Sequence, residues 1–135
     1  MTLYIELGGR SVIERAVRQV LNVRLQNTSR PSDVMLPHQA ELLREDLTEF
    51  LIFLFGGAPF YEGPAIHHAF SYICNSHSAF DEVRDMFIEE LTLRPQTAGL
   101  RPQVHAALEQ IRHHAVRQPH PAQMQERPQL QARSF

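Results

Sequence analysis

Apolar residues recur at helical spacing in four segments of the chain. The first segment starts at Ser11, which forms a capping box with Glu14, a pattern typical of a helix start because each side chain bonds the other's backbone N–H. Its apolar positions share one helical face: Ile13, Ala16, Val17, Val20 and Leu21. The pattern predicts a helix from Ser11 to about Leu25, followed by turn-forming sequence over 26–33.

A second helix is predicted over about 37–55, before the glycine pair at 56–57, since glycine commonly ends a helix. Its apolar positions follow one another at i, i+4, i+7, i+8 and i+11: Leu43, Leu47, Phe50, Leu51 and Leu54. Residues 58–64 have the composition of a loop. Residues 65–77 are ambiguous, and we expect one irregular helical turn followed by loop.

A third and a fourth helix are predicted over about 78–93 and 101–116, separated by a break at 95–99. The third has an apolar face made of Phe80, Val83, Phe87 and Leu91. Its acidic residues lie mostly on the opposite side, where we expect a solvated face rather than a binding surface. The fourth begins with Pro102 near its first position. Its apolar stripe contains Val104, Leu108, Ile111 and Ala115.

Four amphipathic helices without any strand-like alternation predict an all-α domain that packs helix on helix. We place this domain at residues 1–117. Residues 118–135 are rich in proline and glutamine and poor in apolar residues, and they are predicted to be a disordered C-terminal tail.

Composition and charge narrow the classes of function. The net charge is −2, and the 13 basic residues are all arginines scattered along the chain. The chain therefore has no concentrated positive charge that would indicate binding to nucleic acid. A single cysteine, Cys74, cannot form an internal disulfide. The N-terminal residues lack a signal-peptide pattern, and the longest apolar run, 50–55, is far shorter than the roughly 20 residues of a membrane span. We expect a cytoplasmic protein that binds neither nucleic acid nor membrane.

Short glycine and aromatic motifs follow one another in a fixed order. They are Leu3-Tyr4, Leu7-Gly8-Gly9, Phe55-Gly56-Gly57, Tyr61-Glu62-Gly63 and Phe80-Asp81. Their order and spacing over about 2–116 resemble those of group 1 truncated haemoglobins. The resemblance implies a two-on-two globin-like helical sandwich. It also implies haem b held by one proximal histidine, with a diatomic gas, oxygen or nitric oxide, bound on the opposite side.

The haem-contact positions that this resemblance implies are all apolar and non-ligating here. They are Phe70 at the proximal histidine, Leu21 at the distal tyrosine, Leu47 at the distal polar residue, Leu43 one turn earlier, and Val34 or Met35 at the aromatic residue that stacks on the porphyrin. Apolar residues at all of these positions are expected if the pocket is rebuilt for another ligand or is filled by its own side chains. Filling is consistent with the small empty volume of packed protein interiors.

Histidines near Phe70 offer a replacement iron ligand. A two-residue shift of the match would put His68 at the proximal position, so His68 is the candidate metal ligand. His67 cannot share the same iron, and His77 is a more distant candidate. Neighbouring histidines are otherwise ordinary polar loop residues. The pair at 113–114 is not a metal site, because adjacent helical side chains diverge by about 100°.

Three functions remain open from the sequence. The first is a haem protein that binds oxygen or nitric oxide through a displaced proximal histidine. The second is a haem-free globin-fold module for sensing or for binding a partner protein. The third is a cavity that holds another apolar ligand, such as a fatty acid or another tetrapyrrole. We do not expect an enzyme, since any catalysis would be haem-dependent oxygen or nitric oxide chemistry.

Overall fold

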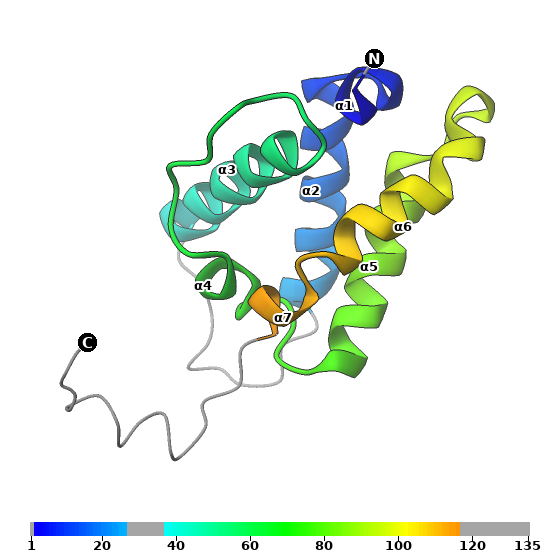
Figure 1. The fold of residues 1–135 in the computed structure, drawn as a ribbon. Helices are drawn as coiled ribbons and strands as arrows, with labels where there is room; N and C mark the ends of the chain where they lie inside the picture. Colours follow the sequence, from blue (N-terminus) through cyan, green and yellow to red (C-terminus); the bar gives the residue numbers. More distant parts are fainter. Residues whose placement is uncertain (1, 27–36, 117–135) are drawn as a thin grey trace, which may run out of the picture.

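The computed structural model describes residues 2–26 and 37–116, and every regular element in these two ranges is a helix (Figure 1). The all-α prediction is confirmed for this part of the chain. The elements are α1 (Leu3–Leu7), α2 (Arg10–Gln26), α3 (Pro37–Leu54), α4 (Ile66–Phe70), α5 (His77–Leu91), the 3-10 helix η2 (Pro95–Leu100), α6 (Arg101–Glu109) and α7 (Arg112–Ala115). The predicted tail at 118–135 and the positions Val34 and Met35 lie outside the described residues.

Helix α2 packs against both α3 and α5 (Figure 1). Two contacts show that α2 and α5 run antiparallel. Near the start of α2, Arg15 Nη2 donates to the Glu90 carbonyl oxygen at 3.2 Å. Near its end, Arg24 Nη1 pairs with Glu82 Oε1 at 2.8 Å. The same end of α2 is held to the segment after α4, because Arg24 Nε donates to the carbonyl oxygen of Ile73 at 3.0 Å.

Helices α5 and α6 form an antiparallel hairpin connected through η2 (Figure 1). At the η2 end, Arg101 Nη1 donates to Thr92 Oγ1 at 3.3 Å. At the other end, Arg84 Nη1 lies 2.5 Å from Glu109 Oε2. The fold therefore contains two packed pairs, α2 with α3 and α5 with α6, which meet through the contact between α2 and α5.

The apolar stripes predicted from the sequence form one continuous core. All five apolar positions named for the first helix are buried, as are the four named on α5. On the second helix the same holds except at Leu54, which is half-buried. Helical periodicity thus identified the core face of each long helix, because a 3.6-residue repeat places those side chains on one side.

The predicted start of the first helix is wrong by one residue. Helix α2 begins at Arg10, so Ser11 lies inside its first turn and is exposed instead of capping it. Gly8 and Gly9 have φ values of +120° and +84°, a left-handed backbone that turns the chain sharply after α1. The Ile13 N–H then points to the carbonyl oxygen of Gly9 at 3.4 Å, which places the helix start directly behind the glycine pair.

The predicted fourth helix is two helices. Helix α6 ends at Glu109 and α7 begins at Arg112, because the N–H of Ile111 bonds three residues back, to the Leu108 carbonyl oxygen at 3.2 Å. This tighter turn redirects the chain, so that Arg112 donates to the His77 carbonyl oxygen at 3.3 Å in the first turn of α5 and to Asp81 in the next turn. Ile111 is buried at the break, as the apolar stripe predicted.

The other boundaries agree with prediction to within two residues. Helix α5 starts at His77, where Ser76 Oγ accepts the N–H of Ala79 at 3.0 Å, an N-cap that the sequence analysis missed. It ends at Leu91 instead of near 93. The ambiguous segment 65–77 contains one short helix, α4, as expected, and its last residue, His77, already belongs to α5. Within the described ranges, no helix is both long and apolar enough to cross a membrane.

Candidate functional site

The four apolar positions that the sequence analysis assigned to a haem site lie in the same core. Leu21 comes from α2, Leu43 and Leu47 come from α3, and Phe70 ends α4. None of the four is more than 5% exposed. The structure therefore places all four in one buried cluster, with α3 contacting both α2 and α4.

Phe70 is held in the core by its backbone and by two neighbouring rings. Its carbonyl oxygen accepts the N–H groups of Ile73 and Cys74 at 3.0 and 2.8 Å, which fixes the chain where α4 ends. Its ring meets Phe50 edge-on, with centroids 6.4 Å apart and planes at 89°, and lies 6.3 Å from the ring of Phe80. With 1% of its surface exposed, Phe70 is packed among aromatic rings where the resemblance implied an iron ligand.

Few polar side chains are buried elsewhere in the core. Among the described residues, the buried polar side chains besides the Cys74 thiol are three threonines, Thr48, Thr92 and Thr97. Each donates its hydroxyl to a carbonyl oxygen three or four residues back, at 2.6 to 3.1 Å. None of these three hydroxyl groups is therefore buried without a partner. The side chains at the four positions that the resemblance assigns to haem contact do not fit haem, because phenylalanine and leucine have no atom that ligates iron.

His68, the candidate iron ligand, lies on the outer face of α4. It is exposed, and its ring meets the half-exposed ring of Tyr72 at a centroid distance of 6.1 Å. Successive helical residues are rotated by about 100°, so His68 points roughly opposite to Phe70, two positions later. His67 is half-buried. Among the described residues, no three histidine, cysteine or carboxylate side chains are placed to hold a metal ion.

His77, the third candidate ligand, lies elsewhere. It begins α5, and its Nδ1 is 3.3 Å from Arg112 Nη1. Its ring centroid lies 5.9 Å from that of His113, which comes from α7. The structure thus separates the sequence-predicted residues into a buried apolar group and histidines outside it.

Cys74 is buried, and burial raises the pKa of its thiol to about 11, an effect that the nearby Arg24 charge partly offsets. Because the thiolate is the nucleophile, we expect Cys74 to react with an aromatic disulfide reagent at least about 100 times more slowly at pH 7.5 than in the urea-unfolded chain. The release of the coloured thiolate, followed with and without urea, measures both rates. Equal rates would show that the thiol is accessible in the folded protein.

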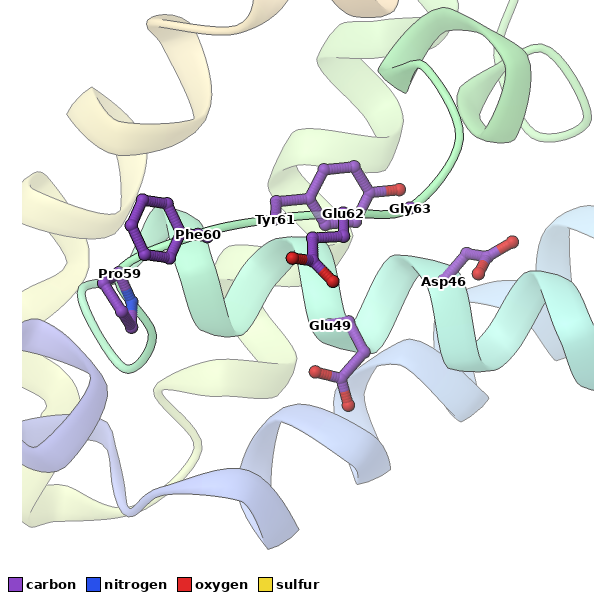
Figure 2. Close-up of a pocket in the computed structure, with 7 residues that line it drawn as sticks. All are labelled: Asp46, Glu49, Pro59, Phe60, Tyr61, Glu62 and Gly63. Atoms are coloured by element: carbon purple, nitrogen blue, oxygen red, sulfur yellow. The ribbon is translucent and has the colours of Figure 1, made fainter.

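Two open hollows are lined by residues that the structure describes, and neither is lined by the core positions described above. One, of about 430 Å³, lies between α3 and the loop that follows it (Figure 2). Its lining residues are Asp46, Glu49, Pro59, Phe60, Tyr61, Glu62 and Gly63. The other, of about 500 Å³, is lined by charged and polar side chains of α2 and α3, and its arginines and carboxylates include the pair Arg10–Glu49 at 2.7 Å.

Comparison of the chain with protein-family models and with curated proteins finds no match. Phe50 and Phe80, whose rings contact Phe70, were predicted only as positions on apolar helix faces, and their ring contacts with Phe70 were not predicted. The exposure of Phe60 was not predicted either. The signal available for Phe60 was its position in a loop between Pro59 and Tyr61, outside any amphipathic stripe.

Proposed function

We propose that this chain is a haem-free domain of the truncated-globin type that serves as a protein-interaction or sensing module. The two helix pairs, α2 with α3 and α5 with α6, and their contact through α2 and α5 support a two-on-two sandwich. The order of the glycine and aromatic motifs supports the same relationship. Because fold does not determine function, the module role is argued from the altered site and not from the sandwich.

One observation carries the haem-free proposal. Phe70 stands where the resemblance implies the proximal histidine, and its ring is packed against Phe50 and Phe80 in the core. Iron ligation at this position would need a lone pair, and porphyrin at this position would need the space that these rings fill. Leu21, Leu43 and Leu47 complete an apolar group with no donor for a bound gas.

Haem binding through His68 is the competing function, favoured by the position of His68 on the same short helix as Phe70. For His68 to face the core, α4 would have to rotate and expose Phe70. Such a rearrangement costs the burial of a phenylalanine side chain, about 2 to 3 kcal/mol. A folded protein without haem is therefore favoured over haem binding through His68.

Haemin titration separates the two functions. We expect the purified chain to give no stoichiometric Soret band, and its melting temperature to change by less than about 1 °C with excess haemin, because a ligand that does not bind the folded state does not stabilise it. Absorption spectra and thermal melts of the wild type and of His68→Ala provide the measurement. A stoichiometric Soret band with stabilisation by several degrees, both lost in His68→Ala, would establish haem binding instead.

A further inference from the structure

The loop after α3 presents an exposed aromatic surface, which we name the aromatic ledge and define as Phe53, Phe60 and Tyr61. Phe60 is 77% exposed and Phe53 is 37% exposed, both high values for phenylalanine. The Phe53 and Tyr61 rings lie 6.4 Å apart. The ledge therefore combines apolar surface from the end of α3 with apolar surface from the loop, beside the hollow of Figure 2.

Contacts on both sides of Tyr61 hold the loop in place. The Tyr61 ring meets Phe50 edge-on at 5.3 Å, which ties the loop to the core. Its hydroxyl donates to the Pro64 carbonyl oxygen at 2.8 Å. A Cβ atom at Gly63 would lie 2.5 Å from that hydroxyl, so the loop closes tightly over the ring. Phe60, which precedes this anchored tyrosine, is exposed to solvent.

Carboxylates border the ledge. Figure 2 shows Glu62 extending from the loop toward α3, where Glu49 and Asp46 lie along the helix. Glu49 is paired with Arg10. Asp46 and Glu62 have no ion-pair partner among the described residues, and Asp46 adds to the burial that raises the pKa of Tyr61. Within the described part of the chain, the hollow beside the rings is lined by three carboxylates and no arginine, and the nearest arginines that the hollows show, Arg10, Arg18 and Arg44, line the neighbouring hollow that Asp46 and Glu49 also border.

We propose that the aromatic ledge and its acidic border bind an arginine-bearing apolar segment of a partner protein. This inference rests on the proposed interaction function and names the chemistry of the partner. A guanidinium group is planar, stacks on aromatic faces and donates two parallel hydrogen bonds to a carboxylate, so it matches rings and carboxylates placed side by side. An apolar neighbour of that arginine would cover Phe60.

Charge and ligand geometry argue against three other occupants of this surface. An anionic membrane surface would be repelled by Asp46 and Glu62. A metal ion would need three converging ligands, and no such group is found among the described residues. A wholly apolar segment would leave Asp46 and Glu62 partly desolvated without a counter-charge, which is costly.

The test uses two matched probes, the peptide acetyl-Leu-Arg-Leu-amide and its citrulline counterpart, which keeps the shape and removes the charge. Titration of the full chain is followed by the amide resonances of ¹⁵N-labelled protein. We expect shifts confined to residues 46–49 and 59–63, a low-millimolar Kd for the arginine peptide, and binding at least about fivefold weaker for the citrulline peptide.

Matched variants locate the binding. Glu62→Gln and Phe60→Ala are each expected to raise the Kd of the arginine peptide at least about threefold, because they remove the charge and the ring separately. Glu89→Gln on α5 and Leu93→Ala, also exposed, serve as controls and should leave the Kd unchanged. Well-dispersed spectra of all variants verify that they are folded.

Three outcomes would overturn the inference. They are equal binding of the two peptides, no localised shift up to about 10 mM peptide, and movement of the ledge resonances with protein concentration alone, which would assign the surface to a second copy of the chain. Each is independent of the haemin result. A failed docking test therefore leaves the haem-free assignment intact, whereas haem binding would overturn the module proposal without altering the measured peptide affinity.

Discussion

Phe70→Ala is expected to lower the free energy of unfolding by about 3 to 5 kcal/mol, the range for removing a buried phenylalanine side chain from a packed core. The ring is 1% exposed and lies between Phe50 and Phe80, so neighbouring side chains have little freedom to close the gap. Urea denaturation followed by circular dichroism measures the loss. If Phe70→Ala does not fold, Phe70→Leu keeps most of the apolar volume and should lose only about 1 to 2 kcal/mol.

Phe60→Ala is the matched control, because it removes the same side chain from an exposed position. It should change the free energy of unfolding by less than about 0.5 kcal/mol. The cavity in Phe70→Ala would be apolar and should accept benzene, so benzene should raise the melting temperature of Phe70→Ala and leave the wild type unchanged. A loss below about 1.5 kcal/mol for Phe70→Ala would contradict the packing described for α4.

The sequence predicted the helices well where one apolar stripe faces one core. Leu43 and Leu47 on α3 illustrate this, since their i, i+4 spacing alone placed them on the buried face. The all-α class followed from four such stripes and is confirmed for the described residues. Periodicity is informative here because burial of a helix face depends on local spacing and requires no knowledge of the partner helix.

Local signals failed where a tertiary contact decides the backbone. The capping box at Ser11 and Glu14 is present in the sequence, but the glycine turn behind α1 starts the helix one residue earlier. The break between α6 and α7 is marked by no glycine or proline in the sequence. It accompanies contacts of Arg112 with residues about 30 positions earlier in the chain. Such contacts are invisible to any pattern within one helix.

The candidate site was predictable only as a set of positions. The family resemblance pointed to Leu21, Leu43, Leu47 and Phe70, and the structure brings these four together in the core. The resemblance does not indicate whether their side chains leave a pocket or fill it, since that depends on how the aromatic rings of α3, α4 and α5 pack together. The exposure of Phe60 likewise depends on how Tyr61 anchors the loop, a contact between segments that no linear pattern encodes.

Arg112→Ala is expected to lower the free energy of unfolding by about 1.5 to 3 kcal/mol, through the loss of charge-assisted hydrogen bonds at a mostly buried side chain. Arg112 Nε and Nη2 donate to the Glu109 carboxylate at 2.9 and 2.8 Å, and Nη2 also donates to Asp81. Its guanidinium lies 4.7 Å above the Phe80 ring, so one side chain joins α7 to the start of α5. Urea denaturation at neutral pH measures the loss.

The same network predicts a pH dependence whose sign follows from Glu109. Hydrogen bonds from Arg112, with a further contribution from Arg84, lower the pKa of Glu109 from 4.5 to about 2. The folded state therefore binds this proton less readily than the unfolded chain, so the stabilisation is complete above about pH 4.5 and is lost as the pH falls toward 2. Arg112→Ala should flatten the stability curve between about pH 5 and 2.5 relative to the wild type, because Glu109 then titrates closer to its ordinary value.

Arg112→Lys separates the geometry of this network from its charge. Lysine keeps the positive charge but has a single ammonium group, which cannot donate to Glu109 and Asp81 in the planar arrangement that Arg112 uses. We expect Arg112→Lys to recover less than about half of the stability lost in Arg112→Ala, and to recover part of the acid sensitivity, because a charge near Glu109 still lowers its pKa. Full recovery of stability by lysine would mean that α7 is held by charge alone. An unchanged acid profile in Arg112→Ala would mean that Arg112 does not control the titration of Glu109.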